Sequence, residues 1–68
     1  MSGMWIKINQ QKLELPDGAT VAEALDAFGA KPPFAVALNL SFVHRQNYAA
    51  TVLQPDDQLE IVQPVAGG

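Results

Sequence analysis

The chain has 68 residues, enough for one domain with a small core, and a formal net charge of −3. It contains no cysteine, which excludes a disulfide, a thiolate metal site or a redox couple of its own. The net negative charge argues against nucleic acid as a partner, because nucleic acids bind surfaces on which Lys and Arg are clustered. No apolar run is long enough to span a bilayer, so we expect a cytoplasmic protein that does not contact membranes.

Two alternating runs predict a hairpin near the start of the chain. Residues 4–8 place isoleucines on one face and Trp5 and Lys7 on the other, and residues 12–15 point two leucines inward. The polar residues between the runs form a turn. Pro16-Asp17-Gly18 ends the hairpin, since proline cannot donate to a strand ladder and Asp-Gly favours a turn.

A helix begins after Thr20, which with Glu23 has the spacing of a capping box. Gly29 supplies a left-handed stop, and Pro32-Pro33 prevent the helix from resuming. The inward stripe of this helix consists of Val21, Leu25 and Phe28.

The second half of the chain reads mainly as strands and turns. Residues 34–38 predict a strand with large side chains on one face and alanines on the other, and Phe42-Val43 form a short apolar segment. Residues 44–47 predict a loop or one helical turn, from which Tyr48 returns toward the core. Residues 58–62 predict the last strand, with Leu59 and Ile61 inward and Glu60 and Val62 outward.

This order predicts an α+β domain of the β-grasp, or ubiquitin-like, type. One helix crosses one face of a mixed sheet of four to five strands, in which the first and last strands are parallel central neighbours. Residues 1–3 are interpreted as a leader or a cloning remnant, residues 4–63 as the domain, and residues 64–68 as a flexible Gly-Gly tail.

The tail is the most informative stretch of the sequence. Gly67 and Gly68 follow Pro64, Val65 and Ala66 and present the terminal carboxylate on a thread that ends without side chains. Because glycine lacks a Cβ, this thread fits a slot too narrow for other residues. The five residues reach about 17 Å when extended, which is enough to enter a buried site in another protein.

The remaining candidates for chemistry are weak. His44 has no cysteine or serine motif to act with, and no further ligands at metal-binding spacing accompany it. Asp56-Asp57 are interpreted as a turn. We therefore expect no catalytic residue and no metal site. Trp5 either covers lysine stems or anchors an interface, and the second interpretation requires that Ala37 and Val62 share its face.

Three stretches of the chain resemble the thiamin sulfur carrier family, ThiS. They are residues 15–25, Val36-Ala37-Leu38-Asn39, and residues 59–68, which close with Val-Ala-Gly-Gly. The family often has Asn-Gly where this chain has Asn9-Gln10 and Asn39-Leu40. It also often has Asp-Gly-Asp, which we align with residues 56–58. These departures affect turn geometry and leave the tail intact.

The resemblance implies a carrier rather than an enzyme. A ubiquitin-activating-type adenylyltransferase (ThiF-like) would use ATP to adenylate the Gly68 carboxylate, while residues 64–67 enter the partner's active site. Sulfur from a donor such as a cysteine desulfurase would then convert Gly68 to a thiocarboxylate. A thiazole synthase (ThiG-like) would take up that sulfur. No permanently bound cofactor is expected in the chain itself.

Three alternatives remain open at this point. A carrier for molybdopterin synthase has a similar fold and tail. A ubiquitin-like modifier would conjugate to lysines through Gly68. A plain β-grasp binding module, such as one for RNA, is disfavoured by acidity and by the lack of a basic stripe.

Overall fold

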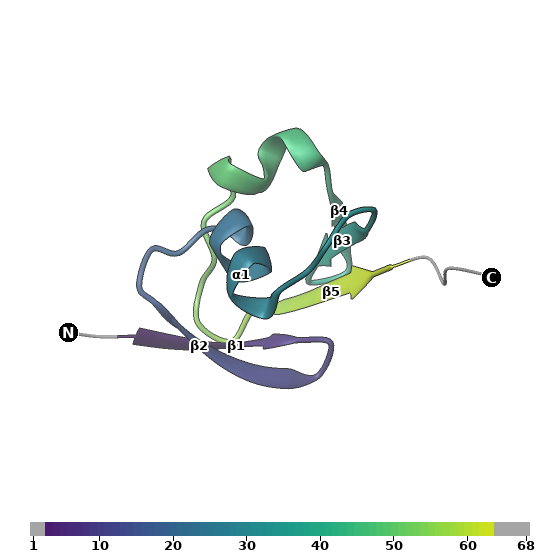
Figure 1. Ribbon diagram of the computed structural model, residues 1–68. Coiled ribbons are helices and arrows are strands. Elements are labelled where there is room, and N and C mark those ends of the chain that lie inside the picture. The colour runs from purple at the N-terminus through teal and green to yellow at the C-terminus, as the bar shows by residue number, and fades with distance from the viewer. Residues whose placement is uncertain (1–2, 64–68) are drawn as a thin grey trace.

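The computed structural model describes residues 3–63 of the chain (Figure 1). Within this part five strands are interspersed with one α-helix and one 3₁₀ helix. The elements in order are β1 (Gly3–Ile8), β2 (Gln11–Pro16), α1 (Val21–Phe28), β3 (Ala35–Leu38), β4 (Ser41–Val43), the 3₁₀ helix η1 (Arg45–Ala50) and β5 (Gln58–Val62).

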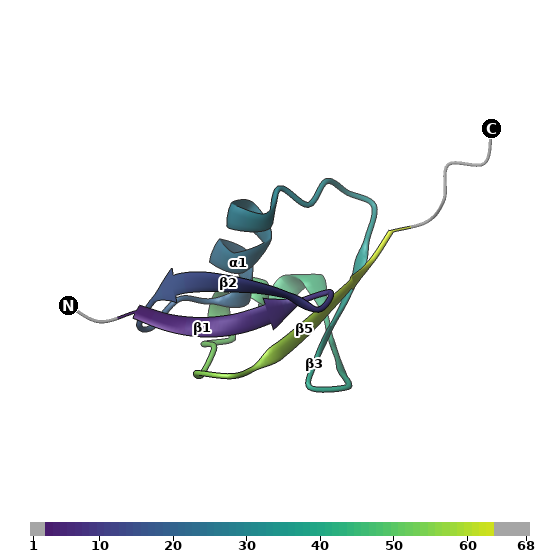
Figure 2. The ribbon, with the colours of Figure 1, turned by 90° about the horizontal axis from the view of Figure 1, so that it is seen from below.

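The five strands form one mixed sheet in the order β2-β1-β5-β3-β4. β1 and β5 are parallel neighbours at its centre, and the β1–β2, β3–β4 and β3–β5 pairs are antiparallel. Figure 2 shows α1 lying across one face of this sheet. This arrangement confirms the β-grasp prediction, including the pairing of the first strand with the last.

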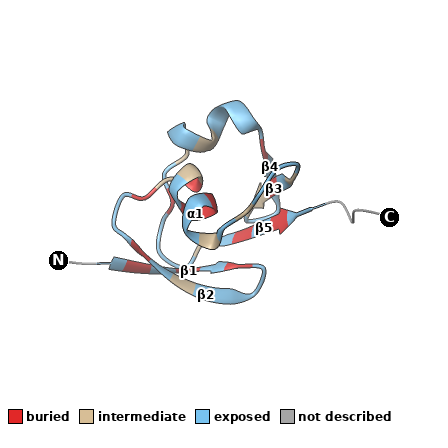
Figure 3. Cartoon of the chain, in the orientation of Figure 1, coloured by how far each residue is buried: buried red, intermediate tan, exposed pale blue. Residues whose placement is uncertain are grey.

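The core lies between α1 and the inner face of the sheet. Ile6, Ile8 and Leu59, on the two central strands, are at most 1% exposed. Strict alternation along β1 and β5 produces this burial, because every second side chain of a strand points to the same face. Figure 3 shows buried residues interspersed with exposed ones along α1, β1 and β5. The sheet and helix therefore form two layers around one core.

Local signals define both ends of α1. The Glu23 backbone N–H donates to the Thr20 hydroxyl at 3.3 Å, and the Thr20 N–H donates to the Glu23 carboxylate at 2.8 Å. Gly29 ends the helix in the left-handed conformation, with φ of 83°. The predicted stripe also faces the core, since Val21 and Leu25 are buried and Phe28 packs against them.

Several boundaries differ from the prediction. β1 begins at Gly3, which was expected outside the domain, because Gly3 pairs with Pro16 across the hairpin. Pro16 is included in β2 since it occupies the last position of an edge strand, where no ladder donor is needed. The segment after His44 is a six-residue 3₁₀ helix rather than a loop or one helical turn.

The two hairpin turns, β1–β2 and β3–β4, have matching backbone geometry. Asn9 and Gln10 have φ of 50° and 72°, and Asn39 and Leu40 have φ of 49° and 72°. Positive φ at both central residues is the pattern of a type I′ turn, whose twist suits a hairpin. Asparagine tolerates this conformation well, whereas leucine and glutamine do so at a cost.

Replacing Leu40 with glycine should therefore stabilise the fold. Glycine removes about 1 kcal/mol of strain from the left-handed conformation of the folded state. It costs roughly 0.5 kcal/mol in return, because the unfolded chain gains conformational entropy. We expect the free energy of unfolding, measured by urea denaturation, to rise by about 0.5 kcal/mol. Leu40→Ala is the matched control, because it removes the same exposed side chain but keeps the Cβ. An equal gain in Leu40→Ala would contradict the backbone explanation.

Candidate functional site

The C-terminal residues predicted to carry the chemistry, Gly68 with Pro64, Val65, Ala66 and Gly67, lie outside the described residues. The structure instead describes the base from which they continue. That base is the end of β5, the central strand, followed by Gln63. The end of β5 and Gln63 are therefore the described residues closest in sequence to the predicted reacting group.

Two of the three residues predicted for a partner-binding face lie close together. Ala37 is opposite Glu60, and Val62 is opposite Ala35 two residues further along the same two strands. Val62 is 64% exposed and Ala37 is partly buried. Both side chains point away from α1, on the outer face of the sheet.

Trp5 shares that face but lies at its other end. Lys7 pairs with Gln58 in the parallel register, so Trp5 and Val62 are separated by six residue steps along the strands, about 20 Å. Trp5 is 52% exposed. The three predicted residues therefore form two separate regions of one face rather than one cluster.

The structure adds Phe42, which we did not single out from the sequence. It is opposite Ala37 in the β3–β4 register and is 61% exposed, so it extends the Val62 region across β3. Its exposure could have been inferred by pairing the short 42–43 segment with the alanine face of the preceding strand. We define the "tail-side patch" as Ala35, Ala37, Phe42 and Val62.

A shallow groove follows the outer face of β5 between the two hairpin turns. Its volume is about 700 Å³, and its walls include Gln10 from the β1–β2 turn and Leu40 from the β3–β4 turn. Leu40 is 90% exposed, so its side chain is available to line the groove. This groove runs along β5 as far as Val62, so it leads toward the residues that follow the strand.

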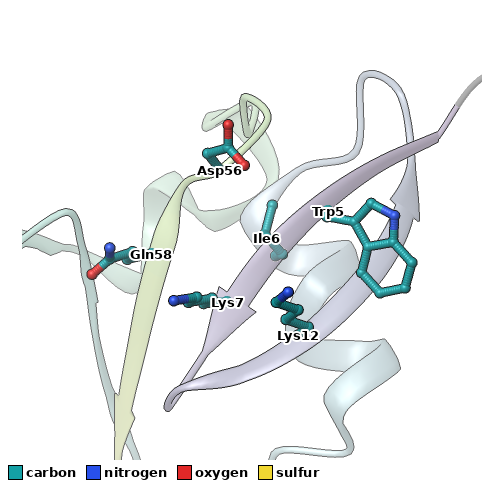
Figure 4. A pocket seen from close by; sticks show the side chains of 6 residues that line it. All are labelled: Trp5, Ile6, Lys7, Lys12, Asp56 and Gln58. Atoms are coloured by element: carbon teal, nitrogen blue, oxygen red, sulfur yellow. The ribbon is translucent and has the colours of Figure 1, made fainter.

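A second hollow, of about 520 Å³, surrounds Trp5 (Figure 4). Lys7 and Lys12 face each other directly across β1 and β2 there, a like-charge pair that costs some stability. In Figure 4 Lys7 extends toward Gln58 while the Trp5 ring lies beside Lys12. Two of the four cationic side chains of this acidic chain are thus gathered next to its one tryptophan.

The other residues considered from the sequence show no built site. His44 is exposed and contacts the Phe42 ring edge-on, with ring centroids 4.8 Å apart. Among residues 3–63 no three metal-ligating side chains are grouped closely enough to hold an ion. No helix in the same part of the chain is long and apolar enough to cross a membrane.

The fold and the outer sheet face define a ubiquitin-like β-grasp protein. A model of the ThiS family matches residues 5–68, almost the whole chain. The chain belongs to the ThiS family.

Individual relatives agree with this assignment. The chain is 33% identical over 66 residues to the sulfur carrier protein ThiS of Escherichia coli, a match that covers 96% of this chain and 100% of that protein. It is 38% identical over 66 residues to a thiazole synthase of Magnetococcus marinus, of whose length it spans 20%. The crystal structure of thiamine biosynthesis protein ThiS from Geobacter metallireducens has the same fold, with a TM-score of 0.78 and 23% identity over 96% of this chain and 100% of that one.

The turn before β5 contains one residue in the left-handed region, Asp56, with φ of 69°. Asp57 holds this turn, because its carboxylate accepts from the Gln54 N–H at 2.7 Å.

The exposure of the tail-side patch predicts that its residues contribute little to folding. Val62→Ala should change the free energy of unfolding by no more than about 0.5 kcal/mol. Ile61→Ala is the matched comparison, since the neighbouring side chain is only 6% exposed and its truncation should cost about 2–4 kcal/mol. Both values come from denaturant titration. Equal losses would mean that Val62 belongs to the core.

Proposed function

We propose that this protein is a sulfur carrier in thiamin biosynthesis that carries sulfur as a thiocarboxylate on Gly68. The observation that carries the proposal is the match to the Escherichia coli sulfur carrier over that protein's full length, together with membership of the ThiS family. The terminal Gly67-Gly68 and the absence of cysteine support it, because a cysteine-free chain has no side-chain thiol on which to carry sulfur.

The chemistry requires activation of the carboxylate. A carboxylate is a poor electrophile, so an ATP-dependent partner first transfers AMP to Gly68 and releases pyrophosphate. A persulfide sulfur then attacks the acyl carbon and displaces AMP. Reduction of the resulting S–S bond by a thiol leaves the thiocarboxylate. In this scheme the carrier supplies the reacting group and its partners supply the catalysis, so it acts as a co-substrate and not as an enzyme.

The partners follow from this sequence of steps. A ThiF-like adenylyltransferase binds the ATP, and a cysteine desulfurase provides the persulfide sulfur. A ThiG-like thiazole synthase accepts the sulfur, and the similarity to a thiazole synthase supports that partner. The carrier needs no bound cofactor of its own, and we place all these steps in the cytoplasm.

The tail-side patch is the surface we propose for partner docking. It presents the exposed side chains of Val62 and Phe42 on the end of β5 and on β4, with the alanines of β3 between them and Glu60 as a charged residue on the same face. A partner that covers it holds the domain at a place where residues 64–68, with a reach of about 17 Å, extend into its active site. Trp5 lies near the edge of such an interface, which typically spans about 800 Å² on each partner.

Intact-mass measurement tests the proposed chemistry directly. After incubation with ATP, the adenylyltransferase, a cysteine desulfurase and cysteine, we expect a gain equal to replacement of one oxygen by sulfur, localised to Gly68. A variant that lacks Gly68 should show no such gain and should keep the melting temperature of the parent chain. No gain in the parent, or a gain on another residue, would contradict the proposal. Sulfur delivery only to a molybdopterin precursor would favour that pathway instead.

Charge substitutions test the docking surface. Val62→Glu should weaken binding to the adenylyltransferase by about tenfold or more, because it places a carboxylate in an apolar contact. Trp5→Glu should weaken it less, since Trp5 is about 20 Å away along the strands. Ala27→Glu on the exposed side of α1 is the control and should bind normally. If calorimetric titration gave the same affinity for Val62→Glu and Ala27→Glu, the tail-side patch would not be part of the interface.

A further inference from the structure

The last residues of β5 extend beyond the strand that pairs with them on one side. β1 and β5 pair only through Lys7 with Gln58 and Ile8 with Leu59. The final main-chain bond between them runs from the Asn9 N–H to the Leu59 carbonyl at 3.0 Å, after which the chain turns into β2. The peptide groups of Ile61 that face this side therefore have no β1 backbone to pair with.

The Asn9 side chain takes the place of that missing backbone. The Ile61 N–H donates to Asn9 Oδ1 at 2.8 Å, and Asn9 Nδ2 donates to the Ile61 carbonyl at 3.1 Å. A carboxamide has the same donor and acceptor as a peptide group, so it extends the ladder by one residue. The two bonds join positions 52 residues apart and are partly buried, which strengthens them relative to exposed bonds.

A second side chain holds the residue after the strand. Gln63 Nε2 donates to the Lys31 carbonyl, in the connection between α1 and β3, at 2.8 Å. Ile61 is thus held by the β1–β2 turn, and Gln63 by the helix connection. Together these contacts keep the backbone in place up to the last residue before the Pro64–Gly68 segment.

We propose that Asn9, assisted by Gln63, is a positioning residue for delivery of the C-terminal carboxylate into the activating enzyme. This inference rests on the proposed sulfur-carrier function. With β5 held through Gln63, binding does not have to order any residue before Pro64. Without the Asn9 bonds, Ile61 and Val62 remain paired with Val36 and Ala35 of β3, but the end of β5 loses its contact on the β1 side and frays more readily.

The expected effect is on apparent affinity. Ordering the equivalent of one backbone residue on binding weakens association by about tenfold, and we expect the frayed end of β5 to cost about that much. Once the tail is seated, the reacting atoms are the same in both proteins, so the maximal rate is retained. Loss of the Asn9 bonds should therefore raise KM for the carrier and leave kcat unchanged.

Asn39 provides a matched control within the same chain. It occupies the equivalent position of the other hairpin turn, and its Oδ1 accepts from the Gln58 N–H at 3.0 Å. Asn39 thus holds the beginning of β5 by the same kind of contact with which Asn9 holds its end. Glycine is the appropriate substitution at both positions, because it adopts the positive φ of each turn and removes only the side-chain bonds.

The experiment compares the parent chain with Asn9→Gly, Asn39→Gly and Gln63→Ala as substrates of a ThiF-class adenylyltransferase. ATP-dependent pyrophosphate release gives KM and kcat for each, and hydrogen exchange reports the Ile61 amide. We expect Asn9→Gly to raise KM about tenfold with kcat within about twofold, and to accelerate Ile61 exchange. Asn39→Gly should keep KM within about twofold of the parent value.

Each other outcome counts against the inference. Equal KM values for the two glycine variants would show that Asn9 acts only through overall stability, and an unchanged KM in Asn9→Gly would also overturn the role. If Asn9→Gly does not fold, Gln63→Ala provides the test, because it changes an exposed residue. A raised KM in Gln63→Ala supports the positioning role, and an unchanged KM refutes it. A parent chain that is not adenylated at all contradicts the proposed function itself, and the inference falls with it.

Discussion

The structure depends on the parallel pairing of β1 with β5 at the centre of the sheet. This contact closes a loop of roughly 50 residues, which costs about 3.5 kcal/mol plus a constant in chain entropy. Burial of Ile6, Ile8 and Leu59, each contributing about 1.5–3 kcal/mol, opposes that cost. The first and last strands therefore hold the domain together, and the C-terminal segment continues from its most constrained element rather than from an edge.

In the proposed function, the reacting group follows a central strand, which gives the protein two parts with different tasks. The folded part is ordered by packing on the inner face of the sheet and presents its outer face to solvent. The segment after Gln63 carries the proposed reacting group. The alternation of β5 connects these tasks, because Ile61 anchors the strand in the core while the adjacent Val62 is exposed. One strand thus contributes to the core and to the proposed docking surface.

The two hairpin turns show how local strain supports this arrangement. Positive φ at both central positions of each turn is unfavourable for Gln10 and Leu40, yet the asparagines that precede them do more than form turns. Asn9 binds the end of β5 and Asn39 binds its beginning, so the tips of both hairpins hold the central strand by side-chain amides. A glycine at either asparagine position would form the turn equally well and would lose this contact.

Much of the fold could be predicted from the sequence, because its signals are local. Alternation along residues 4–8 and 58–62, the capping pair Thr20 and Glu23, and the stop at Gly29 each act within a few residues. Strand and helix existence, the inward faces and the β-grasp order follow from them. The boundaries at Gly3 and Pro16 were missed, since they depend on one residue pairing with another across the hairpin.

The sequence by itself determined the elements, their buried faces and, by resemblance, the chemistry expected of Gly68. Only the tertiary structure decided which exposed residues lie together. Trp5 and Val62 belong to one face in any alternating pattern, but the parallel register places them six residue steps apart and brings Phe42 beside Ala37 instead. The bonds between Asn9 and Ile61 likewise required the register of two strands about 50 residues apart. The reason is physical: alternation specifies which way a side chain points, whereas register comes from how the whole core packs.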